Sequence, residues 1–410
     1  MAGVQAAPAV AAPLRLLFTT QPGHGHFFPM LPLAHAARAA GHDVAFATSP
    51  TFCRHIERAG FTCLPAGVDW LEADIGNTFP DVTTTAAMSV RQETAWWLNN
   101  VWADDLPARI TRDVVGLARS WCPDVVVHEQ WELGGALGAE LSGLPYAMHA
   151  QGRLMSASRW KELAGAALGR LRHRVGLPPD PDLGWVHRYC YFDTIPPSLQ
   201  VPHDLAVAHR YRPAVRRQPS AEDAVPSWMG DIGRRPTVYA SMGTVFNQVP
   251  HVFEAILTGL ADEPVDVILV VGESQDPASL EAPPENVHVE RFVAQATVLP
   301  YCDVVITHAG YNTVSEALSQ GLPLLTIPLR VDQPINAERC VQLGVARRLL
   351  PGEVTPEAVR HSVRALLTDP RYKAGAERIR NEIEAMPPVE RAVARLEQLA
   401  TVATPSPQVV

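Results

Sequence analysis

Two histidine-bearing turns in this 410-residue chain have the composition of sites for proton transfer. The first, QPGHGHFFP at 21–29, follows a short apolar run and opens a helical pattern. Glycines allow a sharp turn there, and a histidine at the turn could act as a general base near neutral pH. His24 and His26 flank one glycine, so a purely structural role in capping the helix stays open for either of them.

The second turn places His128 and Glu129 directly after the apolar run 125–127. An acidic residue at the end of a neighbouring parallel strand could accept the N–H of a base histidine and fix its tautomer. The structural alternative is a solvated carboxylate near the start of the helix expected at 133, where the helix dipole favours negative charge.

A third motif, THAGYNTVSE at 307–316, is the most specific of the three. It has the pattern of a strand end, a small-residue turn and a helix start, where N–H groups, a histidine and two side-chain donors could meet a diphosphate. Glu316 could accept the two hydroxyls of a ribose, and Asp332-Gln333 follows the next expected strand, a place for hydroxyl recognition. An ordinary turn capped by Asn312 is the alternative interpretation.

Apolar runs and helical patterns alternate on both sides of these motifs, which predicts parallel sheets covered on both faces. We expect two doubly wound α/β domains facing each other, with ligands at the carboxyl ends of the strands. A proline-rich stretch, 194–235, breaks the rhythm as a linker would. The expected strands are 14–18, 44–47, 124–128, 145–149, 238–241, 265–271, 287–290, 304–307 and 324–327, and the expected helices are 29–40, 133–142, 252–261, 312–320, 336–343 and a section from 356 onward.

The composition argues against several classes of partner. The net charge is −9, and no Lys/Arg block is long enough for nucleic acid or an anionic membrane surface. No apolar run reaches membrane-spanning length, and we interpret the Ala-rich stretch 1–13 as a disordered tail. The six cysteines are scattered singly, which predicts free thiols in a reducing cytoplasm. A monomer or a homodimer is expected.

These motifs, in this order, resemble the nucleotide-sugar glycosyltransferases of the GT-B fold, in the branch of plant and bacterial natural-product enzymes. Gly25-His26-x-x-Pro29 matches the N-terminal motif whose histidine is the family's base, and Glu129 falls where the family has an aspartate. The loop SMGT at 241–244 matches the loop after the first donor-domain strand. The donor signature is matched by His308, Gly310, Asn312, Thr313, Glu316, Asp332 and Gln333.

Two departures from the family pattern concern the donor base and the dyad. The donor signature usually opens with Trp-x-Pro-Gln, whereas this chain has Phe292-Val293-Ala294-Gln295. Phe292 can still stack on a pyrimidine. Glu129 is one methylene longer than the usual aspartate. With these substitutions, the resemblance implies donor contacts from Ser241, Gly243, Thr244, Phe292, Val293 and Gln295 as well.

The resemblance implies an inverting, metal-independent hexosyltransferase that uses a TDP-deoxysugar or UDP-sugar as co-substrate and needs no other cofactor. His26 would take the proton of a hydroxyl on a small hydrophobic acceptor, and Glu129 would stabilise the imidazolium. The implied domains are 1–212 for the acceptor, a linker at 213–235 and 236–387 for the donor, with a last helix at about 388–402 returning to the first domain. Trp96, Trp97 and Met155 are the candidate acceptor wall.

Rival functions differ in what they require of the sequence. A nucleotide-sugar epimerase or hydrolase could share both domains, and a non-catalytic partner would tend to lose His26 or the 308–316 cluster. A NAD-dependent dehydrogenase needs Gly-x-Gly-x-x-Gly, but Gly23-His24-Gly25 is followed by Phe28. A metal-dependent transferase would use an acidic pair such as Asp180-Pro181-Asp182, which lies in a proline-rich stretch without a preceding strand.

Overall fold

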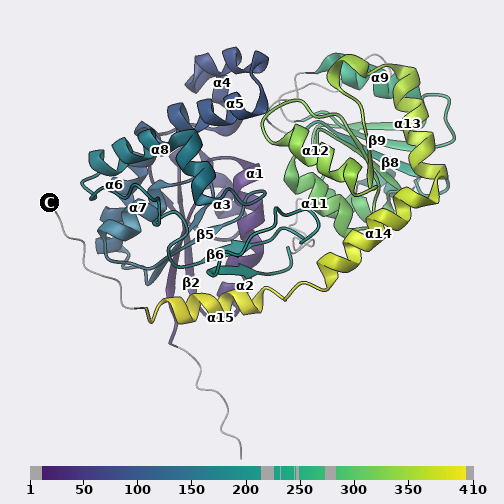
Figure 1. The fold of residues 1–410 in the computed structure, drawn as a ribbon. Coiled ribbons are helices and arrows are strands. Elements are labelled where there is room, and N and C mark those ends of the chain that lie inside the picture. The colour runs from purple at the N-terminus through teal and green to yellow at the C-terminus, as the bar shows by residue number, and fades with distance from the viewer. Residues whose placement is uncertain are drawn as a thin grey trace, which may run out of the picture.

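A computed structural model describes residues 12–213, 226–230, 232–243, 245, 249–272 and 283–402. Most of the expected N-terminal tail, most of the Pro-rich C-terminal tail, part of the linker and Thr244 lie outside the described residues. Two α/β domains stand side by side (Figure 1). No helix among the described residues is both long enough and apolar enough to cross a membrane.

The N-terminal domain is built on a seven-stranded sheet in the order β3-β2-β1-β4-β5-β6-β7, in which every pair is parallel. Its central strands are apolar because helices cover both faces. In β1 the residues from Leu16 onward are buried without a break. The strands are β1 Arg15–Thr19, β2 Asp43–Thr48, β3 Thr62–Pro65, β4 Val125–Glu129, β5 Tyr146–His149, β6 Tyr191–Asp193 and β7 Ala208–Arg210.

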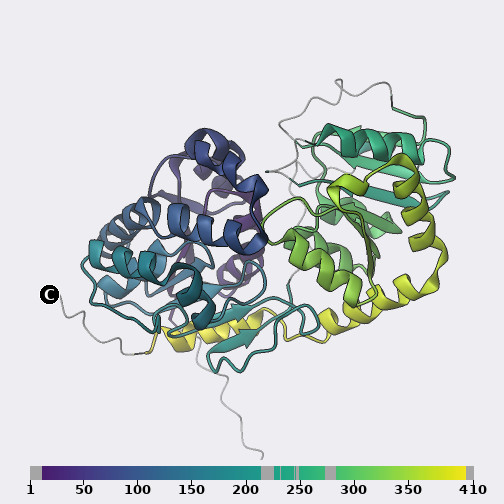
Figure 2. The ribbon, with the colours of Figure 1, turned by 45° about the horizontal axis from the view of Figure 1, so that its top comes forward.

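A run of short helical pieces between β3 and α6 forms the rim of this domain nearest the C-terminal domain (Figure 2). The best-defined piece, α5, starts with a capping box between Ser89 and Gln92. The helical elements are α1 His24–Phe27, η1 Phe28–Met30, α2 Leu31–Ala39, η2 Pro50–Phe52, α3 Cys53–Arg58, η3 Glu72–Asp74, α4 Ile75–Thr78, η4 Pro80–Ala87, α5 Val90–Trp97, η5 Leu98–Trp102, α6 Asp105–Ser120, α7 Gly134–Leu141 and α8 Ala157–Arg174.

The C-terminal domain repeats the plan with a six-stranded parallel sheet in the order β10-β9-β8-β11-β12-β13. Its strands are β8 Thr237–Ser241, β9 Asp266–Val270, β10 Val287–Glu290, β11 Val304–Thr307, β12 Leu324–Thr326 and β13 Ala346–Arg348. Its helical elements are η6 Ser227–Gly230, α9 Pro250–Leu260, α10 Gln295–Val298, η8 Leu299–Tyr301, α11 Tyr311–Ser319, α12 Gln333–Gln342, η9 Pro351–Glu353, α13 Pro356–Thr368 and α14 Pro370–Glu384. The last helix of the chain is α15 Glu390–Leu399.

Both sheets reverse their strand order at one point, between β1 and β4 in the first and between β8 and β11 in the second. At such a switch point the loops leave in opposite directions and open a crevice at the carboxyl ends of the strands. All three sequence motifs follow strands at these two points. The topology therefore concentrates the chemistry of the chain on the two facing sheet edges.

The chain ends on the domain where it began. Helix α14 runs away from the C-terminal sheet, and α15 lies along the N-terminal domain beside α2 (Figure 1). Leu396 and Leu399 of α15 are buried in one core with Leu33 and Phe27. This return ties the two domains together a second time, in addition to the connection near 213–235.

The proline-rich residues 194–212, where the rhythm of strands and helices breaks, lie in the N-terminal domain. Residues 208–210 form β7, which pairs with β6, and Arg210 bonds the buried Asp193 at 2.8 Å. The prolines of this stretch misled the sequence analysis because short edge strands between them carry little periodicity. Strands β3, β6 and β13 were not anticipated either, because three or four residues are too few to show a periodicity.

The expectation of six free thiols is wrong for one pair, since Cys53 and Cys63 form a disulfide. Cys53 begins α3 and Cys63 lies in β3, so the chain returns past its own helix and brings the two Cα atoms to 5.4 Å. That separation is ordinary for a disulfide. Nothing in the spacing of the two residues revealed the turn that joins them. The remaining cysteines, Cys122, Cys190, Cys302 and Cys340, are free.

Candidate active site

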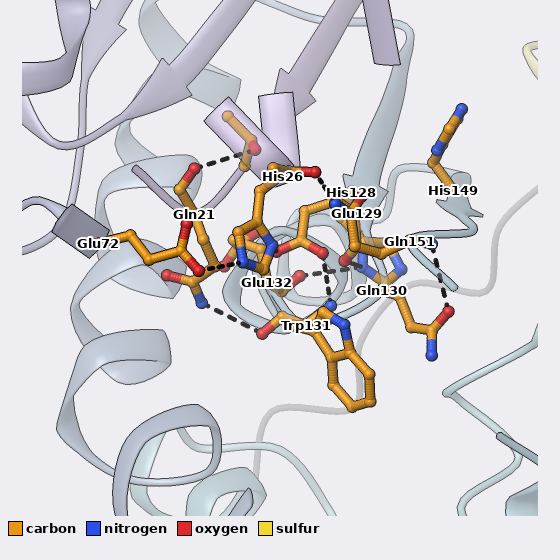
Figure 3. A network of polar contacts seen from close by, with 12 residues as sticks. Gln21, His26, Glu72, His128, Glu129, Gln130, Trp131, Glu132, His149 and Gln151 are labelled. Atoms are coloured by element: carbon orange, nitrogen blue, oxygen red, sulfur yellow. Dashed lines mark hydrogen bonds and ion pairs between the residues drawn. The ribbon is translucent and has the colours of Figure 1, made fainter. Parts of the chain in front are cut away.

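His26 lies at the N-terminal switch point, in the short helix α1 that follows β1. Helical structure begins at His24, five residues earlier than expected, and Gly23 caps it. The side chain of His26 is 10% exposed and points to the end of β4 (Figure 3). Its neighbour His24 stacks on Phe28 instead. The structure thus separates the two histidines that the sequence left as alternatives.

Two carboxylates hold the imidazole of His26, one on each ring nitrogen. Nδ1 lies 3.1 Å from Oε1 of Glu129, and Nε2 lies 3.2 Å from Oε1 of Glu72 (Figure 3). Glu129 is fully buried, and its second oxygen accepts the backbone N–H of Trp131 at 2.7 Å. The glutamate that replaces the family's aspartate therefore reaches the histidine and is itself oriented.

Burial lowers the pKa of His26, but the charges and hydrogen bonds of Glu129 and Glu72 outweigh it and raise the pKa well above 6.5. In this arrangement the imidazole carries a proton on both nitrogens. It can accept a proton at Nε2 only after Glu72 withdraws or after the proton is lost at higher pH. Glu72 is consequently part of the acid–base chemistry of the site.

The position of Glu72 depends on a glycine. A Cβ on Gly23 would stand 2.0 Å from Oε2 of Glu72, so any larger residue would displace the carboxylate. The backbone N–H of Glu72 also bonds the carbonyl of Pro22 at 3.0 Å. Glu72 begins the short element η3 between β3 and α4, where no periodicity or motif in the sequence marks it.

The neighbouring His128 has a different surrounding. Alternate residues of a strand face opposite sides of the sheet, so His128 cannot share the environment of Glu129. Its Nδ1 donates to the carbonyls of Glu129 and Glu132 at 3.0 and 2.9 Å, and burial lowers its pKa to about 4. Glu132 in turn accepts the N–H groups that open α7. These residues shape the strand end and do not face the cleft.

The donor-side turn is formed by strained backbone. Ala309 is buried with φ of 68°, a left-handed conformation that non-glycine residues rarely adopt. It lets α11 start at Tyr311 with Gly310 as its N-cap. The turn points the first N–H groups of α11 toward the cleft, as the sequence motif predicts for an anion site.

His308 lies between two glycines. A Cβ on Gly310 would stand 2.4 Å from its Nε2, and a Cβ on Gly243 would stand 2.7 Å from the same atom. Desolvation lowers the pKa of His308 to about 4. This histidine is therefore neutral at physiological pH, and a hydrogen bond to the backbone of Ser241 holds its ring.

The other predicted donor residues lie around this turn, with individual differences. Asn312 crosses to the N-terminal domain, where its Nδ2 donates to the carbonyl of Gly25 at 2.8 Å. Gln295 donates to Thr313 at 3.2 Å. Oε1 of Gln333 accepts the backbone N–H groups of Leu329 and Arg330, so this atom orients its own loop.

A single cavity of about 2360 Å³ runs between the two domains and is lined by residues of both. Phe292 is 48% exposed at its edge, as an aromatic platform for a base would be. The predicted residues that line the cavity are His26, Ser241, Gly243, Phe292, Val293, Gln295, His308, Gly310, Asn312, Thr313, Glu316, Asp332, Gln333, Trp97 and Met155.

Three tryptophans of the N-terminal domain form an aromatic wall of the cavity, and only one of them was a candidate from the sequence. Trp97 stacks on Trp102 at 5.4 Å, and Trp102 stacks on Trp131 at 4.8 Å. All three line the cavity, whereas Trp96 does not. The prediction for Trp96 is corrected here, because consecutive residues of a helix point in different directions. Trp131 was missed, although it follows the dyad glutamate by two positions.

The acidic pair of the metal-dependent alternative lies away from this cavity. Asp180 accepts the backbone N–H of Trp185 at 3.0 Å, and Asp182 forms an exposed ion pair with Lys161. Among the described residues, no group of three or more His, Cys, Asp or Glu side chains has the geometry to hold a metal ion.

Two facing parallel-sheet domains, with a histidine–carboxylate site on one side of the cavity and a helix N-terminus on the other, define a GT-B glycosyltransferase. Residues 35–239 match the N-terminal domain of the erythromycin biosynthesis protein CIII-like family, and residues 254–399 match its C-terminal domain. The chain belongs to this family and is a natural-product glycosyltransferase.

Individual relatives agree with this assignment along the whole chain. The 10-deoxymethynolide desosaminyltransferase of Streptomyces venezuelae is 28% identical over 424 residues, which cover 94% of this chain and 97% of that protein. The solved spinosyn forosaminyltransferase SpnP has a TM-score of 0.75 at 27% identity, covering 95% of this chain and 100% of its own. Glycosyltransferase VinC, solved in complex with dTDP, has a TM-score of 0.77 at 25% identity, covering 94% and 99%.

Proposed function

We propose that this enzyme transfers a deoxysugar, with inversion and without a metal ion, from a nucleoside diphosphate to a hydroxyl of a hydrophobic natural-product acceptor. The observation that carries the proposal is the hydrogen bond from Asn312 to the Gly25 carbonyl, 2.8 Å long. It joins the turn of the proposed base to the N-terminal end of α11. The two groups that a single displacement needs therefore stand on opposite walls of one cavity.

On the acceptor side, the substrate hydroxyl takes the place of Glu72 at Nε2 of His26. The oxygen attacks the anomeric carbon, its proton passes to Nε2, and Glu129 stabilises the imidazolium through Nδ1. The bond from the anomeric carbon to the diphosphate oxygen breaks in the same step, so configuration inverts. A positioned base of this kind contributes about 10²–10⁴-fold to rate.

On the donor side, the diphosphate leaves toward the first turn of α11. Helix N–H groups carry partial positive charge, and the neutral imidazole of His308 adds no negative charge beside them. These groups supply the stabilisation for which other transferases use a divalent cation. VinC, a relative of the same fold, was solved with dTDP, which favours a thymidine nucleotide here.

The aromatic wall favours a flat, apolar acceptor. Trp97, Trp102 and Trp131 present their rings beside Met155 and Leu154 on the same side of the cavity. Such a surface binds by area and stacking, with few polar groups to set orientation. Glu72, which contacts His26, and Gln151, which donates to the carbonyl of Gly25, line the cavity and could orient a hydroxyl.

Thermal unfolding with a panel of nucleotides tests the donor. We expect TDP or UDP to stabilise the protein by about 2.7 kcal/mol at 100 times its dissociation constant, and NAD to have no effect. With a matching TDP-sugar and an aglycone panel, initial rates should be unchanged by EDTA. A rate that EDTA abolishes and Mn²⁺ restores would contradict the metal-free mechanism. Sugar release that requires no acceptor would identify a hydrolase.

A further inference from the structure

The loop between β12 and α12 crosses from the C-terminal to the N-terminal domain (Figures 1 and 2). Its Arg330 bonds Oε1 of Glu93 through Nε at 3.0 Å and through Nη2 at 2.8 Å. Nη2 also donates to Thr85 and, at 3.2 Å, to the carbonyl of Val82. One guanidinium thus joins α5 and η4 to the donor domain.

Glu93 receives a second contact from the same loop. Its Oε2 accepts the backbone N–H of Val331 at 3.0 Å. Val331 has φ of 58°, which is unfavourable for a β-branched residue and persists only where the surroundings hold it. Those surroundings are Glu93 on one side and Oε1 of Gln333 on the other. The conformation of the loop therefore depends on a residue of the opposite domain.

The pair is buried although it lies outside the cavity. The side chains of Arg330 and Glu93 are 16% and 5% exposed, and neither lines the cavity. A buried ion pair tends to add little stability over apolar packing, whereas the loss of one partner leaves an uncompensated charge. A pair of this kind fixes the arrangement of the loop against α5 more than it stabilises the fold.

Each partner stands next to residues that face a different substrate. Glu93 precedes Thr94 and Trp97, which line the acceptor side of the cavity. Arg330 precedes Val331, Asp332 and Gln333, which line the donor side. The loop hydrogen-bonds both carboxylate oxygens of Glu93 in α5 and the hydroxyl of Thr85 in η4. A displacement of the loop would therefore move α5 with it.

We propose that the Arg330–Glu93 pair couples the two substrate sites, so that a donor sugar seated against the 329–333 loop fixes α5 in its acceptor-binding position. The inference rests on the proposed donor and acceptor sites. Arg330 and Glu93 are positioning residues that act through the loop and the helix. Coupling is reciprocal, so a change in Glu93 must also weaken donor binding in the other domain.

Hydrogen exchange measures the coupling without knowledge of the acceptor. The probe is whichever of TDP-glucose and UDP-glucose binds the wild-type protein more tightly by calorimetry. At saturation it should slow exchange of the 90–102 amides by roughly fivefold or more, the lower end of ordinary coupling. The corresponding nucleoside diphosphate, which lacks the sugar, should have a smaller effect.

The variants are Glu93→Gln, Arg330→Gln and the double substitution. Glu93→Gln keeps the shape and one acceptor for Val331, so it guards against simple misfolding. All three should reduce the sugar-dependent protection to less than about twofold. The double variant should lose no more protection than either single variant, because each substitution breaks the same connection. Arg339→Gln is the matched control, since Arg339 donates across the domains to Ser198 at 2.8 Å without touching α5. It should retain full protection.

The outcomes separate the two proposals. Folded Glu93 and Arg330 variants that keep wild-type protection, or an Arg339 variant that loses it equally, would overturn the coupling and leave the proposed function standing. Wild-type protein that binds neither nucleotide sugar and neither diphosphate would overturn the proposed function, and the coupling with it.

Discussion

The two walls of the cavity each present a histidine, and the two histidines have opposite electrostatic environments. His26 lies between the carboxylates of Glu72 and Glu129, which raise its pKa well above 6.5 in spite of burial. His308 lies between Gly243 and Gly310, and desolvation lowers its pKa to about 4. One ring is charged in the free protein and the other is neutral.

Under the proposed function, the difference follows from what each wall does. Proton transfer requires a group whose charge changes during the reaction, and paired carboxylates stabilise that change. Diphosphate binding requires N–H donors at close range. A carboxylate beside His308 would repel the diphosphate. Glycines serve there because they bring backbone and ring together without adding charge. The comparison predicts that His26 and its two carboxylates determine the pH dependence of turnover. It also predicts that the turn around His308 determines the affinity for the donor.

The largest expected effect is that of His26→Ala. Without the base, turnover should fall by about 10²–10⁴-fold, because a positioned base contributes about that much to the rate. TDP affinity, measured by calorimetry, should stay within a factor of about two. Turnover near the wild-type level would remove His26 from the mechanism and direct attention to Glu72.

Gly310→Ala should disturb the opposite wall. Its new Cβ would clash with the ring of His308, so the ring or the turn at the start of α11 must shift. Loss of one hydrogen bond to a charged ligand corresponds to about 1.5–3 kcal/mol, or roughly 10- to 150-fold weaker TDP binding. Gly352→Ala is the control, because a Cβ there meets nothing within 4 Å. Equal affinity in both variants would place the diphosphate away from His308.

The smallest effect, and the most specific, is a shift in pH dependence. The base form of His26 accumulates only as pH rises through its raised pKa, so kcat/KM should increase with pH above 6.5 and then level off. Glu72→Gln removes one charge that raises this pKa and should move the acidic limb to lower pH. His308 should contribute no limb between pH 6 and 9, since its pKa is about 4.

Stability offers an independent check on the same variant. A raised histidine pKa contributes stability that is complete below the unfolded value of about 6.5 and is lost as pH rises through the folded value. Glu72→Gln should therefore lower the melting temperature more at pH 6 than at pH 9. An acidic limb and a melting difference that both match wild type would show that Glu72 does not bind His26 in solution.

The sequence alone was sufficient where function depends on local pattern. The turn at 21–29, the strand end at Glu129 and the motif at 307–316 each follow an apolar strand, and parallel topology brings such strand ends to one edge. Two facing doubly wound domains were predicted correctly for that reason, and the GT-B fold was predicted from the resemblance of the motifs to that family. The approach of Glu129 to His26, at 3.1 Å, was inferred from the same rule despite 103 residues of separation.

Only the tertiary structure decided contacts made by irregular segments. Glu72 and Glu93 lie in short helical pieces and Arg330 lies in a loop, and their partners are 46 and 237 residues away. The choice between Trp96 and Trp97 and the Cys53–Cys63 bond likewise depended on the path of short helices and turns. Local patterns determine where a strand ends and a helix begins, because those are properties of neighbouring residues. Which side chains then meet across a cleft is determined by packing, which no short stretch of sequence contains.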